Sequence, residues 1–225
     1  MSHKVASMTD WLIAPRPAPS LPLDNDVRRF AVRRIFCVGQ NYAAHAREMG
    51  AAGDKPDPFF FTKPADAVVV DGADPVYPLA TANLHYEVEL VVALGEGGTP
   101  VAWGVGVDLT RRDLQSAAKS AGRPWDAAKA FDQSAPCGAL SLTPPPANAA
   151  IRLKVNGEVR QNSHLGDMLW DVDGILGKAA QLWDLQAGDL FFTGTPEGVG
   201  PLNAGDYVEA EIEGLPSLSF TVMAR

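Results

Sequence analysis

Cysteine is scarce in this chain of 225 residues, where Cys37 and Cys137 are the only two. So few cysteines in so long a chain exclude a disulfide scaffold, and a reduced compartment is the default expectation. No apolar run approaches the roughly 18 residues that a membrane-spanning helix requires. The opening residues, MSHKVASMTDW, contain no apolar segment of the kind found in secretory signals. We therefore expect a cytoplasmic protein that has no membrane partner.

The chain has fewer positive than negative residues. Its 19 lysines and arginines and 27 aspartates and glutamates give a formal net charge of −8. An acidic chain is a poor binder of nucleic acid, so we expect no such partner. The same acidity suits a protein that gathers a few carboxylates around a divalent cation. With 46% apolar and 20% charged residues, the composition excludes a disordered chain and a coiled coil.

Strand patterns outnumber helical ones, and the two do not alternate as in a doubly wound sheet, which predicts a β-rich α+β fold. Strands are expected at 33–39, 58–64, 84–94 and 101–109, a hairpin around Asn156–Gly157, and closing strands after residue 189. Helices are expected at 110–122, from a Thr110 cap to Gly122, and at 172–183. Proline-rich residues 14–24 predict an extended wrap, and residues 142–150 a linker. We expect a 1–32 N-terminal extension and a single catalytic domain over 33–225.

Two glutamates stand on one face of the strongest predicted strand. Side chains two apart along a strand point the same way, so Glu87 and Glu89 share a face with His85 beside them. Asp108 ends the next apolar strand, and if the two strands pair it can approach both glutamates. Three carboxylates without a cysteine–histidine cluster favour Mg²⁺, Mn²⁺ or Ca²⁺ over zinc or copper. The alternatives are a solvated edge strand for the glutamates and a helix cap for Asp108.

Polar residues of a possible substrate site follow the carboxylates. On the helix after Asp108, Arg112, Gln115 and Lys119 lie on one face. Lys129 stands among apolar residues, where the aliphatic part of a lysine side chain often packs while its ammonium group reaches solvent. Thr195 belongs to a glycine-rich loop that can offer its hydroxyl to an anion, or can be a plain turn.

A general base is suggested by His45 and Glu48, which are three apart on a predicted helical turn. At this spacing the carboxylate can orient the imidazole, although such pairs are also common on protein surfaces. Cys37 and Cys137 lack any nearby activating group in the sequence, so both are expected to lie in the core.

Seven segments occur in an order that resembles the fumarylacetoacetate hydrolase family: CVGQNYAAHAREMG, PFFFTKP, LHYEVEL, GVDLTRRDLQ, GRPWDAAKAFDQSAP, LKVNGEVRQ and GDLFFTGTPEGVGPL. The resemblance runs from about residue 33 to the C-terminus and is strongest to short bacterial members of the fumarylpyruvate hydrolase and acylpyruvase type. It implies a mixed β-roll, a homodimer and one catalytic Mg²⁺ or Mn²⁺. It also implies a small keto-acid substrate and a place in aromatic catabolism.

The resemblance also assigns roles to individual residues. Glu87, Glu89 and Asp108 match the metal ligands of the family, and His45 and Glu48 match the pair that activates water. Lys129 and Gln115 match side chains that contact the keto acid, Thr195 matches the hydroxyl that holds the substrate carboxylate, and Arg112 is a weaker match to a substrate contact. One segment departs from the family: only 18 residues, Leu90–Val107, separate Glu89 from Asp108, where many relatives have a longer stretch.

The resulting hypothesis is metal-dependent hydrolysis of a carbon–carbon bond in a 2,4-dioxo acid such as fumarylpyruvate. Decarboxylation of oxaloacetate, or isomerisation of a hydroxydienoate, could use the same metal and enolate chemistry. A β-rich module that binds an ion only for stability is the alternative from another class.

Overall fold

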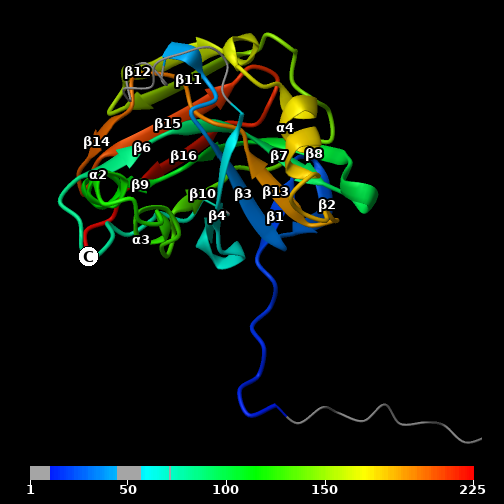
Figure 1. The fold of residues 1–225 in the computed structure, drawn as a ribbon, viewed down its shortest axis with the longest axis horizontal. Coiled ribbons are helices and arrows are strands. Elements are labelled where there is room, and N and C mark those ends of the chain that lie inside the picture. The colour runs from blue at the N-terminus through cyan, green and yellow to red at the C-terminus, as the bar shows by residue number, and fades with distance from the viewer. Residues whose placement is uncertain (1–10, 45–56, 71) are drawn as a thin grey trace, which may run out of the picture.

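The computed structural model describes residues 11–44, 57–70 and 72–225, and β-strands form most of its regular structure (Figure 1). The central sheet has five strands in the order β4-β3-β13-β7-β8. Their bounds are β3 Arg34–Gly39, β4 Phe59–Lys63, β7 Val88–Leu94, β8 Pro100–Val107 and β13 Asp189–Phe192. Strand β13 runs parallel to β3 and antiparallel to β7, which makes the sheet mixed.

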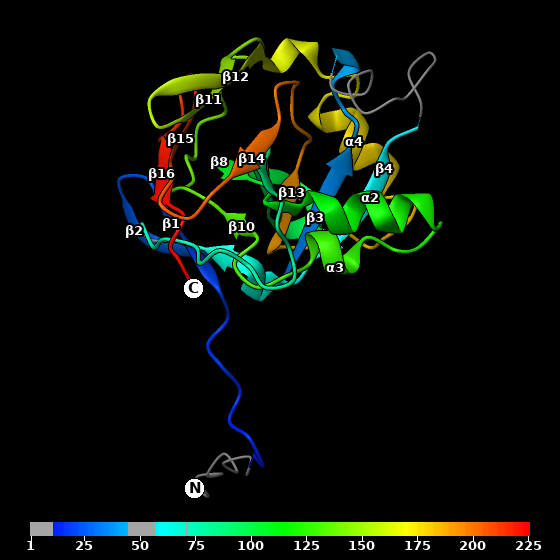
Figure 2. The ribbon, with the colours of Figure 1, turned by 90° about the vertical axis from the view of Figure 1, so that its left-hand side faces the viewer.

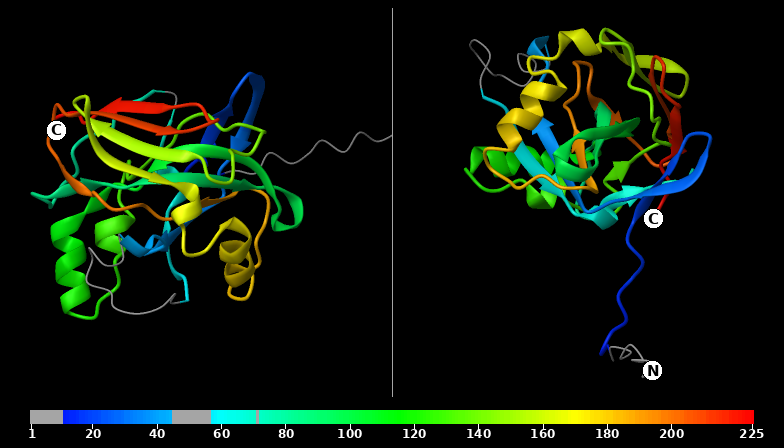
Figure 3. Two further views of the ribbon diagram at one scale, coloured as in Figure 1. Left: turned by 90° about the horizontal axis from the view of Figure 1, so that it is seen from above. Right: turned by 90° about the vertical axis from the view of Figure 1, so that its right-hand side faces the viewer.

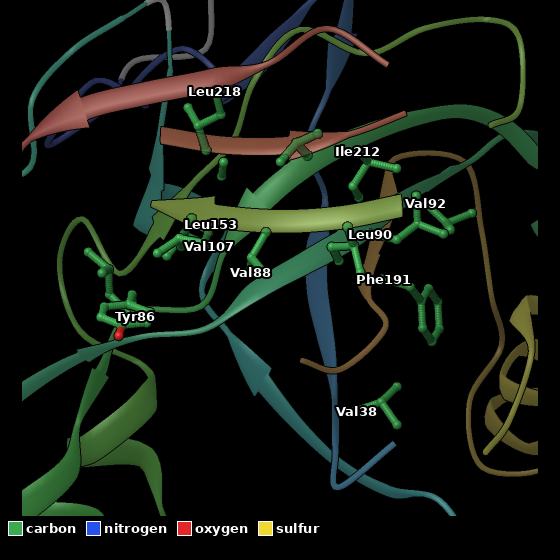
Figure 4. Close-up of a cluster of buried hydrophobic side chains, with 14 of the residues drawn as sticks. Val38, Tyr86, Val88, Leu90, Val92, Val107, Leu153, Phe191, Ile212 and Leu218 are labelled. Atoms are coloured by element: carbon green, nitrogen blue, oxygen red, sulfur yellow. The ribbon is translucent and has the colours of Figure 1, made fainter. Parts of the chain in front are cut away.

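A four-stranded antiparallel sheet packs on one face of the central sheet. Its order is β12-β11-β15-β16, with bounds β11 Ala150–Val155, β12 Glu158–His164, β15 Tyr207–Ile212 and β16 Leu218–Thr221. Alternate residues of both sheets meet in a buried apolar cluster, in which Leu153 and Ile212 lie across from Val88 and Leu90 (Figure 4). A second cluster, with Val91, Cys37 and Phe192, covers the opposite face, so the central sheet is buried on both sides.

Smaller elements surround the two sheets. The strands are β1 Ser20–Leu23, β2 Asp26–Ala31, β5 Val68–Val69, β6 Leu84–Tyr86, β9 Thr110–Arg111, β10 Ala135–Pro136 and β14 Gly200–Leu202, and the α-helices are α2 Arg112–Ser120, α3 Asp126–Lys129 and α4 Val172–Ala179. Short 3₁₀ turns are η1 Ala65–Ala67, η2 Glu96–Gly98 and η3 Leu165–Asp167. Helices α2 and α3 lie side by side (Figure 2), and α2, α3 and α4 lie on the side away from β15 and β16 (Figure 3). Within the described ranges, no helix has the length and apolar content of a bilayer-crossing segment.

The strand expected over 84–94 is interrupted at Glu87, which corrects the sequence-based prediction. Residues on its two sides join different sheets: β6 pairs with β14 and β9, whereas β7 pairs with β13 and β8. The Glu87 carbonyl accepts a hydrogen bond from the Asp108 amide at 2.8 Å, so the chain is held where it passes from one sheet to the other. Strands β7 and β8 pair in register as expected, with Val88 opposite Val107.

Helix α2 ends as the sequence predicts but begins differently. Gly122 has a φ of 61°, and the amides of Gly122 and Arg123 bond back to the carbonyls of Lys119 and Ala118, which is the glycine-dependent Schellman ending. Thr110 is not the N-cap. It belongs to β9, and its hydroxyl donates to the Asp108 carbonyl at 3.2 Å, so the helix starts two residues later, at Arg112.

The remaining predictions are refined rather than overturned. The Asn156–Gly157 hairpin turn is confirmed, with φ values of 52° and 80° that match a two-residue type I′ turn. Helix α4 is shorter than expected and stops at Ala179. Within the proline-rich segment, residues 20–23 form β1, and Leu21 is fully buried in the second cluster. Residues 142–149 contain no helix or strand, as the linker prediction requires.

A buried carboxylate ties the start of β13 to the start of β3. Asp189 accepts hydrogen bonds from Arg34 at 3.0 and 2.7 Å, from Arg33 at 2.9 Å and from the Gln186 amide at 3.0 Å. Burial alone would raise the pKa of Asp189, but the hydrogen bonds from Arg34, the Gln186 amide and Arg33 outweigh it, so the pKa lies below its ordinary value.

We expect Asp189→Asn to lower the free energy of unfolding at pH 7 by about 2–3 kcal/mol, because hydrogen bonds to a charged group are lost while both arginines stay partly hydrated. A carboxylate with a depressed pKa in the folded state stabilises the protein above its unfolded-state pKa, and this contribution disappears as the pH falls through the folded-state pKa. The variant should therefore lose less stability than the wild type between pH 5 and 3, as measured by urea unfolding. Glu96→Gln, on an exposed turn, is the control and should change stability by less than about 0.5 kcal/mol. Equal stability of wild type and Asp189→Asn at pH 7 would contradict this account.

Candidate active site

Three buried carboxylates meet at one end of the central sheet. Glu87 lies at the junction of β6 and β7, Glu89 on β7, and Asp108 directly after β8. One oxygen from each lies within 4.8 Å of the others, and the three residues are 5%, 2% and 0% exposed. The antiparallel pairing of β7 and β8 produces this arrangement, because the Glu89 position lies opposite Gly106, two residues before Asp108. The solvated edge strand considered as an alternative is therefore wrong for this pair of glutamates.

Three cationic side chains surround these carboxylates. Lys129 Nζ donates to Glu87 Oε2 at 2.8 Å and to Asp108 Oδ2 at 2.7 Å, and Lys63 Nζ lies 2.8 Å from Asp108 Oδ1. Arg112 donates to the other oxygen of Glu87. Lys129 is only 2% exposed, so its head group belongs to the site rather than to solvent. Burial alone would lower the pKa of Lys129, but the charges of Asp108 and Glu87 outweigh it and raise the pKa to about 12.

The carboxylates fit a divalent cation. Burial raises the pKa of Glu89 well above its ordinary value, and the charges of Asp108 and Glu87 raise it further, so the cluster favours an added positive charge. Asp108 Oδ1 is buried and forms an ion pair with the Lys63 ammonium, but within the described residues it receives no hydrogen bond of good geometry. Carboxylate oxygens are the ligands that Mg²⁺ and Mn²⁺ prefer. Glu87, Glu89 and Asp108 are therefore the residues that would hold such an ion.

Backbone and amide groups position two of the site residues. The Gly194 amide donates to Glu89 Oε2 at 2.7 Å. Gly194 has a φ of 99°, and a Cβ there would lie 2.6 Å from the Cβ of Asn41, so only glycine fits this close approach. Gln161 Nε2 donates to the Thr195 hydroxyl at 2.8 Å, and its carbonyl oxygen accepts from the Val88 amide at 3.0 Å.

A cavity opens beside the carboxylates and collects most of the predicted substrate residues. Arg112, Gln115 and Lys119 of α2 contribute one wall, as their shared helix face predicts. Arg112 donates to the Gln115 carbonyl oxygen. The remaining lining comes from Val38, Gly39, Gln40, Phe61, Glu87, Trp125, Lys129 and Thr195. The structure thus brings together Glu87, Glu89, Asp108, Arg112, Gln115, Lys129 and Thr195, whereas His45 and Glu48 lie outside the described residues.

Some contacts of the site were not predicted. Lys63 was not predicted as a site residue, yet it is 2% exposed and contacts Asp108. A signal was available, since Lys63 is two residues from Phe61 and so shares the inward face of β4. Gln161 was missed, although it stands at an inward position of the predicted hairpin. His85 contacts Asn83 and Arg112 rather than the carboxylates, and burial, with the charge of Arg112, lowers its pKa to about 4.

The two cysteines lie in the core, as expected. Cys37 and Cys137 are fully or almost fully buried, and burial raises the pKa of both thiols, that of Cys137 to about 12. Both thiols are therefore protonated at neutral pH and are unsuited to attack on a substrate.

Comparison with known proteins adds independent information. The family model described as the C-terminal domain of fumarylacetoacetate hydrolase matches residues 34–223. A fumarylpyruvate hydrolase of Ralstonia sp is 39% identical over 190 residues, which cover 77% of this chain and 98% of that protein. The mitochondrial oxaloacetate tautomerase of Homo sapiens is 37% identical over 203 residues, covering 84% of this chain and 91% of that protein.

Solved structures agree with these sequence matches. The crystal structure of fumarylpyruvate hydrolase from Pseudomonas aeruginosa, in complex with Mn²⁺ and pyruvate, superimposes with a TM-score of 0.93 at 44% identity. The match covers 96% of this chain and all of that one. The β-rich fold expected from the sequence is thereby confirmed as that of the matched domain.

Proposed function

The chain belongs to the fumarylacetoacetate hydrolase family, and from this premise we propose that it hydrolyses a carbon–carbon bond in a 2,4-dioxo acid of the fumarylpyruvate type. The products are pyruvate and a carboxylic acid. The observation that carries the proposal is the buried cluster of Glu87, Glu89 and Asp108, with Lys129 and Arg112 beside it, next to a cavity that Glu87, Lys129 and Arg112 help to line. The similarity to a structure that contains Mn²⁺ and pyruvate supports the same assignment.

The polar side chains of the cavity fit the pyruvyl end of such a substrate. The Thr195 hydroxyl and the Gln115 amide can donate hydrogen bonds to a carboxylate and an oxo group. Arg112, which is only 8% exposed, adds a positive charge to the lining of the same cavity. When bound, a Mg²⁺ or Mn²⁺ ion held by the three carboxylates supplies a Lewis acid that stabilises negative charge on substrate oxygens.

Hydrolysis then needs an activated water and a place for the released electron pair. We propose that His45, oriented by Glu48, removes a proton from water, whose oxygen attacks the carbonyl at C4. The C3–C4 bond breaks, its electron pair forms the pyruvate enolate, and C3 is protonated by the imidazolium. The Lys129 ammonium stabilises the enolate oxygen as charge develops there, which is the electrostatic contribution that lowers such barriers most.

Oxaloacetate tautomerisation is a second candidate, because several relatives with 37% identity carry that name. Like oxaloacetate decarboxylation and hydroxydienoate isomerisation, it passes through an enolate of the same kind. None of these reactions consumes water, so the release of a carboxylic acid beside pyruvate separates hydrolysis from them.

Finer properties of the protein follow from the family resemblance. We propose a cytoplasmic homodimer that acts in the catabolism of aromatic compounds, with residues 33–225 as the catalytic domain and residues 1–32 as an N-terminal extension whose strand β1 packs against that domain. The family match that begins at residue 34 supports this division.

The deciding experiment follows the ultraviolet absorbance of enolised fumarylpyruvate and, in parallel, that of enol-oxaloacetate. With Mg²⁺ or Mn²⁺ we expect decay of fumarylpyruvate to pyruvate and fumarate, and with EDTA a loss of at least about 10³-fold. His45→Ala should abolish hydrolysis, because no base then activates the water. Metal-dependent tautomerisation without fumarylpyruvate cleavage would favour the second candidate, and melting that depends on metal without any turnover would favour an ion-binding module.

A further inference from the structure

A row of three side chains leads from the carboxylates to the surface along one face of α2. Arg112, Gln115 and Lys119 are spaced by three and four residues, so they lie above one another. The first two are 8% and 5% exposed, whereas Lys119 is exposed at the C-terminal end of the helix. All three line the same cavity. The row therefore places one positive charge, that of Arg112, beside the buried carboxylates and a second, that of Lys119, at its exposed end.

Aromatic rings face this row across the cavity. Trp125 precedes α3, and Phe61 lies on the inward face of β4. Their ring centroids are 6.1 Å apart, and Phe59 supports Trp125 edge-on at 4.9 Å. Such rings offer a flat apolar surface that suits a planar, conjugated group.

We propose that Lys119, together with the wall formed by Trp125 and Phe61, is the subsite for the distal acyl group and selects planar, unsaturated chains that end in a carboxylate. This inference rests on the proposed function. The polar residues near the metal ligands were assigned only to the pyruvyl end of the substrate, and the inference assigns residues to its acyl end.

Distances along the helix support the assignment. Four residues of α-helix rise about 6 Å, so Lys119 starts about that far beyond Gln115, and its side chain can fold back towards the cavity. With ordinary carbon–carbon bond lengths, a fumaryl group places its terminal carboxylate about 4 Å beyond the reacting carbonyl. With the pyruvyl end at Arg112 and Gln115, the terminal carboxylate therefore falls within reach of the Lys119 ammonium.

Arg123 supplies a matched control. It has the same charge and lies four residues further along the chain, but the turn at Gly122 takes it out of the helical row. It lines a neighbouring cavity that shares Phe61, Trp125 and Lys129 with the first one, but Lys119 lines only the first cavity and Arg123 only the second. The pair of variants therefore tests on which side of the aromatic wall the terminal carboxylate binds.

The test compares kcat/KM for fumarylpyruvate with that for acetylpyruvate, whose acyl group has no terminal carboxylate, in the metal-loaded enzyme. In Lys119→Gln we expect the ratio of the two values to fall at least about tenfold, mainly through KM for fumarylpyruvate, because a hydrogen bond between charged groups is lost. Arg123→Gln should leave the ratio within about twofold. A ratio that is unchanged in Lys119→Gln, or reduced equally in Arg123→Gln, would overturn the proposal.

Binding of the product fumarate gives a second measurement that does not depend on turnover. Calorimetric titration of the metal-loaded wild type should detect fumarate, and Lys119→Gln should weaken its binding at least about tenfold, whereas pyruvate binding stays within twofold. If the wild type cleaves neither acylpyruvate, the proposed function fails, and the fumarate titration alone decides the subsite. Equal fumarate affinity in wild type and variant overturns the subsite.

Discussion

Glu89→Gln is expected to lower kcat for acylpyruvate hydrolysis by about 10³-fold or more and to abolish tight binding of Mg²⁺ or Mn²⁺, because it removes one of three carboxylate ligands with almost no change in shape. The Gly194 amide can still donate to the amide oxygen of glutamine. Burial and the neighbouring charges of Asp108 and Glu87 raise the pKa of Glu89, so a neutral side chain at this position relieves repulsion in the metal-free protein.

The variant should therefore unfold at the same or a higher temperature than the wild type in EDTA, yet gain no thermal stability when Mn²⁺ is added. Calorimetric titration with Mn²⁺ and the fumarylpyruvate assay measure the two losses. Glu96→Gln serves as the control and should bind and react as the wild type does. Undiminished Mn²⁺ affinity in well-folded Glu89→Gln would show that the cation site lies elsewhere.

Lys129→Met is expected to reduce kcat by about 10²–10³-fold and to destabilise the metal-free protein by about 3–5 kcal/mol. The ammonium holds both Glu87 and Asp108 in the buried cluster, so its removal leaves two carboxylates with less compensating charge. A divalent cation replaces that charge, and saturating Mn²⁺ should restore most of the lost stability without restoring the rate.

Urea unfolding in EDTA and in excess Mn²⁺, together with the hydrolysis assay, tests this expectation. Lys178→Met is the control, because Lys178 pairs with exposed Asp57 and its removal should cost less than about 1 kcal/mol. If metal-free Lys129→Met were as stable as the wild type, the ammonium would not compensate the carboxylates.

Much of the site could be predicted because its main determinant is local. Alternation along a strand places Glu87 and Glu89 on one face, and a second apolar strand that ends in Asp108 completes the cluster once the two strands pair. The short stretch between Glu89 and Asp108 proves sufficient, since β7 and β8 form a direct hairpin closed by the turn at Glu96–Gly98.

What escaped prediction depends on contacts between distant segments. The break at Glu87 follows from the pairing of β6 and β7 with different sheets, which strand alternation cannot reveal. Thr110 has the residue type of a helix cap, but the Lys129 ammonium donates to its hydroxyl at 2.6 Å. The Lys63 contact with Asp108 joins residues 45 positions apart in the chain. It cannot be read from strand neighbours, because β4 and β8 are the two edge strands of the central sheet.

The balance between carboxylates and cations at the base of the cavity has a consequence for the order of events. Glu87, Glu89 and Asp108 carry a formal charge that Lys63, Arg112 and Lys129 match, so these six side chains present a formally neutral pocket. A divalent cation changes the formal sum to +2, which attracts the negatively charged pyruvyl end of the substrate, while the second carboxylate belongs to the proposed Lys119 subsite. Local charge therefore favours an anionic substrate most after the metal has bound, despite the overall acidity of the chain. We expect compulsory ordered binding, with the metal first and the keto acid second.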